Sequence, residues 1–300
     1  DARVFALNSY ENRVYQVGIE DGEPLIAKFY RPNRWSEAAL REEHAFSFAL
    51  QAQEVPVVAP LQINGESLFH FEGFHFALFP RRGGHAPEPG DLDQLYRLGQ
   101  LLGRLHSVGS LSPFQHREVL SPATLGERSV NFLLASEHLP QRLRERYQRI
   151  TTELLQELRA RFAEVAASSV RLHGDCHLGN LILRDDILHV VDLDDCRQGP
   201  AVQDMWMLLC GTRMEQQAQI SELIEGYEEF RDFDRRELAL IEPLRTLRLM
   251  YYSAWLAQRW DDPAFPKAFP WFGKESYWDE HVKALEEQAR VLNEPALAVY

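Results

Sequence analysis

The segment with the clearest chemical signal is His173-Gly174-Asp175-Cys176-His177-Leu178-Gly179-Asn180, in which a carboxylate and an amide stand five positions apart. A loop of that length lets Asp175 reach an attacking hydroxyl, while the amide oxygen of Asn180 turns back toward a Mg²⁺ on the phosphate side. Asp175 is therefore the candidate base or orienting group of a phosphoryl transfer, and Asn180 is a candidate Mg²⁺ ligand. Taken alone, the same residues also fit a loop turn in which Asp and Asn side chains bond to the backbone.

A second signal is acidic and follows at Val190-Val191-Asp192-Leu193-Asp194-Asp195, where two apolar residues lead directly into three carboxylates. Carboxylates this close repel one another unless a cation neutralises them, and hard oxygen donors favour Mg²⁺ over Zn²⁺. On a continuing strand, Asp192 and Asp194 share one face while Asp195 points away. We therefore expect Asp192 to be the principal Mg²⁺ ligand and Asp194 the second choice, with a solvated surface turn as the alternative.

A lysine suited to hold phosphates lies in the strand-like run Leu25-Ile26-Ala27-Lys28-Phe29-Tyr30. Side-chain alternation places Ile26 and Lys28 on one face, which gives an apolar platform for a nucleotide base beside an ammonium group. The alternative is a lysine on an edge strand whose ammonium reaches into solvent. On the following helix we expect Glu43 to pair with Lys28, because it lies on the apolar face, whereas Glu42 would face solvent.

The polar loop Asn8-Ser9-Tyr10-Glu11-Asn12 occupies the place of a phosphate-covering loop, although it contains no glycine. A hydroxyl and backbone N–H groups can bond a phosphate, so Ser9 is a candidate nucleotide contact, with an ordinary polar hairpin turn as the competing interpretation. By position, residues 79–82 would form the hinge that offers backbone groups to adenine. Together these candidates predict ATP as co-substrate and Mg²⁺ as the metal.

The combination of these segments resembles the aminoglycoside phosphotransferase and choline kinase superfamily, whose signature pairs His173-Gly174-Asp175-x-His177-x-x-Asn180 with Asp192. The Asp-to-Asn interval is also that of the protein-kinase catalytic loop, with Gly174 where that loop has Arg. Further segments are similar to bacterial stress-response protein kinases of this superfamily and extend over nearly the whole chain: Asn8 to Gln16, Lys28 to Pro32, Val191 to Asp195, Gly199 to Asp204 and Asp262 to Trp271.

The resemblance implies a cytoplasmic, monomeric, Mg²⁺-dependent kinase that phosphorylates Ser/Thr on proteins and is associated with bacterial stress survival. It also implies roles for individual residues. Asp175 is the proton acceptor, Asn180 and Asp192 hold Mg²⁺, Lys28 contacts ATP, and Ser9 is a functional position in the nucleotide loop.

Positioning these groups requires a small β-rich part followed by a helical part. Period-2 runs between turn residues predict strands at residues 13–17, 24–30, 57–63 and 74–79. Ser36 is a candidate N-cap for a helix running to about Gln53, and Asp91 for one that ends near Gly109. A further helix is expected over residues 141–167, and short strands over residues 170–172, 181–183 and 187–191.

The predicted fold class is α+β, with a protein-kinase-like two-lobed fold. Residues 1–80 would form the nucleotide-binding lobe, a small antiparallel sheet with one main helix. Residues 81–300 would form a larger, mostly helical lobe that carries catalysis and acceptor binding. The Pro/Gly-rich stretch after Pro80 marks the expected boundary.

Composition excludes several other classes. The formal net charge of −13 leaves no basic surface for nucleic acid or for an anionic membrane. No stretch approaches the run of about 18 apolar residues that spans a bilayer. Three cysteines are too few for a disulfide framework, which favours a reducing compartment and hence the cytoplasm.

Two supporting residues and two competing functions remain open. His173 is expected to orient the catalytic loop by hydrogen bonding, and Asp204 either to cap a helix or to brace that loop from beneath. A kinase for an amino alcohol, a sugar or an aminoglycoside would share the same core as a protein kinase. A nucleotide-binding pseudokinase is the third possibility, although one feature argues against it: the joint presence of Lys28, Asp175, Asn180 and Asp192.

Overall fold

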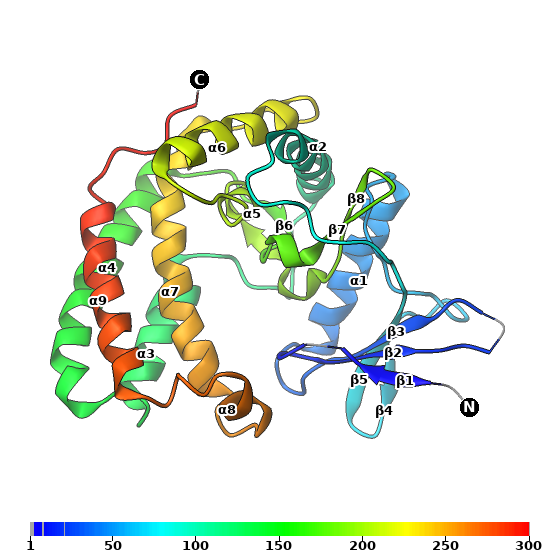
Figure 1. Ribbon diagram of the computed structural model, residues 1–300, viewed down its shortest axis with the longest axis horizontal. Helices are drawn as coiled ribbons and strands as arrows, with labels where there is room; N and C mark the ends of the chain where they lie inside the picture. Colours follow the sequence, from blue (N-terminus) through cyan, green and yellow to red (C-terminus); the bar gives the residue numbers. More distant parts are fainter. Residues whose placement is uncertain (1–2, 8, 21, 300) are drawn as a thin grey trace. The chain divides into compact units, whose positions relative to one another are not determined.

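A five-stranded antiparallel sheet opens the chain in the computed structural model, which describes residues 3–7, 9–20 and 22–299. Its spatial order is β1-β2-β3-β5-β4 (Figure 1). The strands are β1 (Val4–Ala6), β2 (Arg13–Val17), β3 (Leu25–Phe29), β4 (Phe69–Phe71) and β5 (Phe74–Pro80). The predicted strands at residues 13–17, 24–30 and 74–79 are confirmed, and β3 lies at the centre, paired with β2 on one side and β5 on the other.

One helix, α1 (Glu37–Ala52), accompanies the sheet as expected. Ser36 is its N-cap, since the Ser36 side chain accepts a hydrogen bond from the backbone N–H of Ala39 at 3.2 Å. Helix and sheet share a buried apolar cluster: Tyr30, Leu40, Leu68 and Ala77, with Trp35 and Phe79 against it. This cluster packs α1 against the sheet whose central strand, β3, carries Lys28.

The strand predicted at residues 57–63 is wrong. The backbone there makes only isolated pairings: Val58 N–H donates to Val190 O at 2.9 Å, Leu61 N–H donates to Leu78 O at 2.7 Å, and Ile63 forms a bridge with Glu66. Pro56 and Pro60 carry no N–H donor, so the segment cannot continue a ladder. The sequence prediction also missed β4, a three-residue strand that forms a hairpin with β5.

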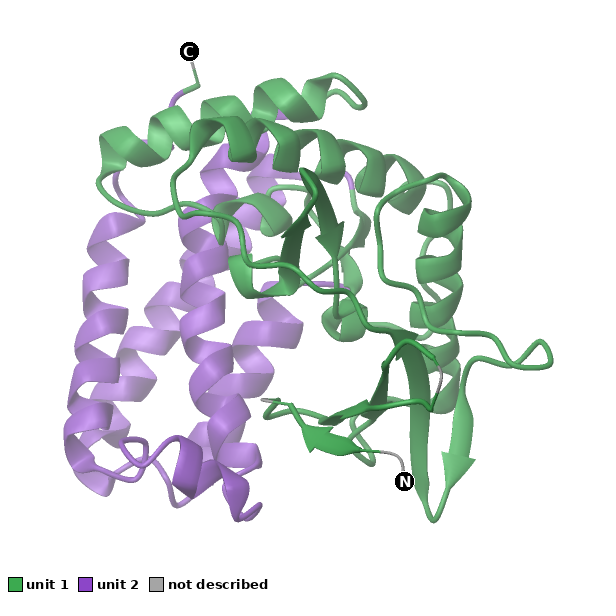
Figure 2. Cartoon of the chain, turned by 45° about the vertical axis from the view of Figure 1, so that its right-hand side comes forward, with its two compact units in different colours: residues 1–118, 169–233, 299–300 green, residues 119–168, 234–298 purple. Residues whose placement is uncertain are grey.

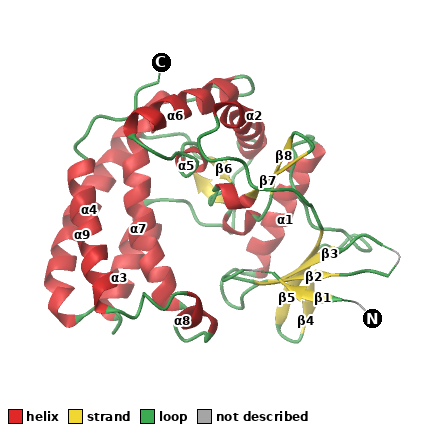
Figure 3. Cartoon of the chain, viewed as in Figure 1, coloured by secondary structure: helices red, strands yellow, loops and turns green. Residues whose placement is uncertain are grey.

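The elements around the predicted catalytic loop are two short antiparallel pairs and three helices. β6 (Val170–Leu172) pairs with β9 (Arg197–Gly199), and β7 (Leu181–Arg184) pairs with β8 (Ile187–Val190). The β7–β8 turn is tight, because Asp185 and Asp186 both have positive φ, of 51° and 60°. The helices are α2 (Leu92–Gly109), capped by Asp91 as predicted, α5 (Gln203–Trp206) and α6 (Arg213–Glu228). Figure 3 separates these helices and strands by colour.

The remaining helices are α3 (Arg128–Ala135), α4 (Arg144–Val165), α7 (Ile241–Gln258), α8 (Ala264–Ala268) and α9 (Glu275–Val291). Helix α4, with a 3₁₀ turn at Gln141–Leu143 before it, confirms the helix predicted over residues 141–167. Many aromatic side chains of this part form core contacts, such as Trp255 with Phe265 at 5.1 Å between ring centroids. None of the helices in the described part of the chain is long and apolar enough to cross a membrane.

The chain divides into two compact units (Figure 2). The first comprises residues 1–118, 169–233 and 299–300, and the second comprises residues 119–168 and 234–298. An antiparallel sheet with one main helix, followed by a larger, mostly helical part, confirms the predicted α+β protein-kinase-like fold. Residue 80 ends β5 inside the first unit, and the lobe boundary at that position stays a prediction.

Candidate active site

The catalytic loop is braced by Asp204, a fully buried residue of α5. Its carboxylate accepts the backbone N–H of His173 at 2.7 Å and that of Gly174 at 2.8 Å. A third bond joins it to His106 Nε2 on α2 at 3.0 Å. Of the two expected roles, Asp204 therefore braces the loop; the N-cap position of α5 is occupied by Val202, which makes no capping bond with its side chain.

His173 joins the catalytic loop to Val191, the residue between the end of β8 and the acidic cluster. Its Nδ1 accepts the backbone N–H of Asp175 at 3.3 Å, and its Nε2 lies 2.9 Å from the carbonyl oxygen of Val191. Because Nδ1 is the acceptor, the ring proton belongs on Nε2, which donates to Val191. His173 thus orients the loop by hydrogen bonding, as predicted.

Gly174 stands where the loop passes against the acidic cluster. Its φ is 87°, in the region that favours glycine, and a Cβ at this position would lie only 2.1 Å from the backbone oxygen of Asp195. No larger residue fits without moving one of the two segments. The glycine that replaces the usual Arg of the kinase loop therefore has a steric cause.

Asp175 and Asn180 are brought together by the loop. The amide nitrogen of Asn180 donates to the carbonyl oxygen of Asp175 at 3.0 Å, which leaves the amide oxygen as the atom able to coordinate a cation. The side chain of Asp175 is 26% exposed, and His177 Nε2 lies 3.5 Å from its carboxylate. Asp175 is thus accessible to a substrate hydroxyl.

The acidic cluster does not continue the strand, so the prediction about its faces is wrong. β8 ends at Val190, Asp192 has the left-handed backbone angles φ 60° and ψ 65°, and Leu193–Asp195 form a 3₁₀ turn. We call residues 192–195 the acidic turn. The strand alternation that would have paired Asp192 with Asp194 does not apply, and Asp195 contacts two arginines instead of pointing away.

Side-chain cations, which the sequence analysis had not considered, neutralise two of the three carboxylates. Arg34 contacts Asp194 Oδ2 and also Asp195 Oδ1, the latter at 2.6 Å, and Arg197 adds a contact to Asp195 at 2.8 Å. Burial raises the pKa of each carboxyl, but the surrounding cations, led by Arg34, together outweigh it and hold the pKa of both below its usual value. The crowding of carboxylates therefore does not by itself require a metal.

Lys28 is buried on the central strand, so the interpretation as an edge-strand lysine is wrong. Its ammonium lies 2.7 Å from Asp192 Oδ1, 3.4 Å from Asp194 Oδ1 and 3.7 Å from Glu43 Oε1. Burial lowers the pKa of Lys28, but these carboxylates, led by Asp192, outweigh it and hold the pKa well above its usual value. Lys28 is therefore charged and suited to bind phosphate.

Glu43 faces Lys28, as expected, and has a second cation that the sequence analysis missed. Arg117, fully buried at its side chain, lies 2.8 Å from Glu43 Oε2 and also donates to the carbonyl oxygens of Asp194 and Cys196. It thereby connects α1 to the acidic turn. Glu42 does not simply face solvent, since it accepts two backbone N–H groups, from Gln115 and His116.

Of the predicted nucleotide loop, the structure describes Ser9 but not Asn8. Ser9 is half-buried in the segment before β2. Asn12, which the sequence analysis did not single out, is buried and donates to Asp194 at 3.0 Å. The signal that could have pointed to Asn12, Arg34 and Arg117 was the acidic cluster itself, because buried carboxylates need donors and cations.

Metal binding at Asn180 and Asp192 is consistent with the donor chemistry. Asp192 is half exposed, with 50% of its side chain accessible, and offers a hard carboxylate oxygen, as Mg²⁺ prefers. Within residues 3–7, 9–20 and 22–299, no group of three or more His, Cys, Asp or Glu is arranged to hold a metal ion. A cation here would therefore need oxygens from a nucleotide or water besides these two residues.

Comparison with known proteins bears on the same site. The model of the phosphotransferase enzyme family (APH) matches residues 3–241, a range that contains every residue of the candidate site described above. The chain belongs to this family. The predicted superfamily resemblance and the prediction of a kinase are thereby confirmed.

Individual relatives of this phosphotransferase agree with that assignment. Stress response kinase A of Escherichia coli K12 is 46% identical over 297 residues, covering 99% of this chain and 90% of that protein. Serine/threonine protein kinase RdoA of Salmonella typhimurium is 46% identical over 301 residues with the same coverages. The solved complex of amicoumacin kinase hAmiN with AMP-PNP and Ca²⁺ shares the fold, with a TM-score of 0.75 at 19% identity over 95% of this chain and 88% of that one.

Proposed function

We propose that this phosphotransferase is an ATP- and Mg²⁺-dependent Ser/Thr protein kinase. The supporting observation is that hydrogen bonds within the first unit link three groups: the lysine expected to bind phosphate, the residues expected to bind metal, and the expected base. Lys28 bonds directly to Asp192, and His173 bonds both to Asp175 and to the residue before Asp192. The amide of Asn180 closes the loop on Asp175.

Each residue has one role in the proposed reaction. Lys28, held by Glu43, neutralises phosphate charge, and Ser9 contacts the nucleotide from its loop. Asn180 and Asp192 hold Mg²⁺, which when bound supplies charge neutralisation at the phosphates. Asp175 accepts or orients the acceptor hydroxyl proton as the new O–P bond forms and the bond from the γ-phosphorus to the bridging oxygen of ADP breaks.

The acceptor assignment comes from the relatives. A protein 46% identical to this chain over 99% of its length is described as a serine/threonine protein kinase, and others as stress response kinase A. We propose the same acceptor class and a part in a bacterial stress response. Action in the cytoplasm, which follows from the predicted reducing compartment, and as a monomer, which follows from the family resemblance, is part of the proposal.

The decisive experiment is phosphotransfer from radiolabelled ATP to a generic protein substrate, with a panel of amino alcohols, sugars and aminoglycosides tested in parallel. Label on protein Ser or Thr, lost in Asp175→Asn, is the expected result. The matched control is Asp186→Asn, which removes a carboxylate of the exposed β7–β8 turn, whose nearest ion-pair contact is Arg97 at 3.9 Å.

The alternatives give different outcomes in the same assay. Label confined to the small molecules would establish a small-molecule kinase in place of a protein kinase. Nucleotide binding without any transfer to an acceptor would establish a pseudokinase. Equal activity of Asp175→Asn and the unsubstituted protein would show that the assignment of the base is wrong.

A further inference from the structure

The segment at residues 9–12 is held in place by side chains, although a phosphate-covering loop usually depends on glycines. The buried side chain of Asn12 donates through Nδ2 to Asp194 at 3.0 Å and accepts the backbone N–H of Arg31 through Oδ1 at 3.0 Å. Arg31 in turn donates to the carbonyl oxygens of Glu11, at 3.0 Å, and Tyr10, at 3.2 Å. These bonds hold the backbone of the segment in place, and the side chain of Asn12 attaches it to the acidic turn.

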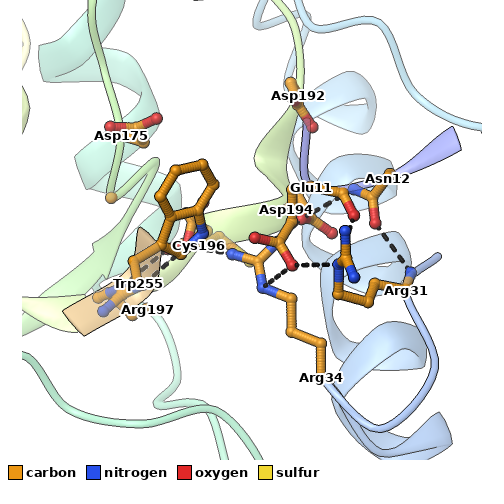
Figure 4. Close-up of polar contacts among 12 residues, drawn as sticks. Glu11, Asn12, Arg31, Arg34, Asp175, Asp192, Asp194, Cys196, Arg197 and Trp255 are labelled. Carbon is orange, nitrogen blue, oxygen red and sulfur yellow. Dashed lines mark hydrogen bonds and ion pairs between the residues drawn. The ribbon is translucent and has the colours of Figure 1, made fainter. Parts of the chain in front are cut away.

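A second connection between the same two segments is made by Arg34 (Figure 4). Its guanidinium contacts Asp194 and Asp195 through separate nitrogens, and its Nε lies 3.6 Å from the carboxylate of Glu11. The Arg34 side chain is only 9% exposed and that of Asp194 only 4%. One planar cation therefore joins the segment before β2 to the turn that carries Asp192.

We propose that Asn12 and Arg34 are positioning residues that fasten residues 9–12 to the acidic turn through Asp194, so that the nucleotide-contacting loop and Asp192 keep a fixed spacing. The proposal rests on the proposed function, because it assumes that these segments bind a nucleotide. Asp194 then acts as the anchor of the turn, while Asp192, two residues before it, remains available to solvent and ligand.

The physical basis is the low exposure of the anchor. A buried carboxylate that loses one cation or donor keeps its full desolvation cost, so the turn must move to reach water or another partner. Arginine is suited to this place because its planar fork donates to the two carboxylates through separate nitrogens, whereas a lysine would offer a single ammonium nitrogen. A polar residue at position 34 would leave Asp194 with Lys28, at 3.4 Å, as its remaining side-chain cation, and would release residues 9–12.

The test measures binding of AMP-PNP with Mg²⁺ by calorimetry, which needs no turnover. We expect Arg34→Gln to weaken binding about tenfold or more, the change that loss of a charged hydrogen bond produces. Asn12→Ala should weaken it about threefold or more. The double variant should lose less than the product of the two factors, because both residues act through Asp194.

A matched control separates positioning from a general effect on the fold. Arg41→Gln removes a neighbouring arginine that bonds only at the surface, to Glu37 at 2.9 Å and Glu66 at 3.0 Å, and should bind AMP-PNP as the unsubstituted protein does. Hydrogen exchange of a peptide covering residues 9–14 should accelerate in Arg34→Gln and not in Arg41→Gln. Arg34→Lys should recover part of the affinity.

The outcomes separate this inference from the proposed function. If the unsubstituted protein binds no AMP-PNP, the proposed function fails. If it binds, and Arg34→Gln and Asn12→Ala bind equally tightly with unchanged exchange at residues 9–14, the positioning role is wrong while the proposed function stands. Should Arg34→Gln fail to fold, Asn12→Ala, which keeps every charge, decides the matter alone.

Discussion

Replacement of Asp204 should separate the geometry of the catalytic loop from nucleotide binding. This carboxylate accepts three hydrogen bonds, from His173 N–H, Gly174 N–H and His106, at 2.7, 2.8 and 3.0 Å, and it is fully buried. In Asp204→Asn, the amide oxygen can keep the bonds to His173 and His106, but the amide nitrogen then faces the N–H of Gly174. One buried donor is left without a partner, which costs about 1 to 3 kcal/mol.

Asp204→Ala removes the acceptor from all three donors. Bonds to a charged group contribute about 1.5 to 3 kcal/mol each and are not additive, so we expect a loss of roughly 4 kcal/mol in the free energy of unfolding. That is a large part of the total of about 5 to 15 kcal/mol for a folded protein. Urea denaturation followed by intrinsic fluorescence measures it for both variants.

The catalytic consequence should fall on kcat rather than on nucleotide affinity. Asp204 supports the backbone immediately before Asp175, but its hydrogen bonds reach neither Lys28 nor Asp192. A loop displaced by about 1 Å can cost about a hundredfold in rate. Asp204→Asn should therefore lower kcat at least tenfold, with the KM for ATP little changed. An Asp204→Ala protein as stable and as active as the unsubstituted one would refute the reasoning.

Three further predictions follow from burial. Gly174→Ala should abolish activity and destabilise the fold, because the added Cβ would lie 2.1 Å from Asp195 O; normal kcat and an unchanged denaturation midpoint would contradict this. Burial lowers the pKa of His281 from 6.5 to about 4, so the unfolded state binds the proton more readily than the folded state does. The free energy of unfolding should therefore fall as the pH drops from 6.5 toward 4, by up to about 3 kcal/mol from this group. A His281→Gln protein whose free energy of unfolding has the same pH dependence would contradict this. Cys176 and Cys196 are buried with raised pKa values, the latter about 12, so alkylation of the native protein followed by mass spectrometry should label neither, and only Cys210 should react.

The sequence predicted features that depend on short-range patterns. The caps at Ser36 and Asp91 are formed by a side chain and a backbone N–H three positions later, so local spacing encodes them. The strands β2, β3 and β5 follow from alternation between turn residues. The interval from Asp175 to Asn180 is also local, since the bond that closes it joins residues five apart.

The tertiary structure decided the electrostatics of the candidate site. The side chains that bond to Asp194 lie far away in the chain: Asn12, a hydrogen-bond donor, is separated from it by 182 positions and Arg34, a cation, by 160. No pattern in the sequence states which of many arginines will meet a given carboxylate, because that depends on how β3, α1 and the acidic turn pack. The sequence could show only that three adjacent carboxylates needed cations, and the predicted cation was a metal.

The same distinction explains the errors in local structure. Residues 57–63 have the composition of a strand, but the prolines at 56 and 60 remove donors, and Val58 pairs with a strand more than a hundred residues later. Asp192 adopts a left-handed backbone where the chain turns after β8. The turn brings Asp194 into contact with Arg34 and the backbone of Asp195 close to Gly174. The sequence by itself determined which groups are proposed to perform the chemistry, since their types and spacing are local. Only tertiary packing decided how their charges are balanced, because buried charges are neutralised by whichever partners the fold brings within reach.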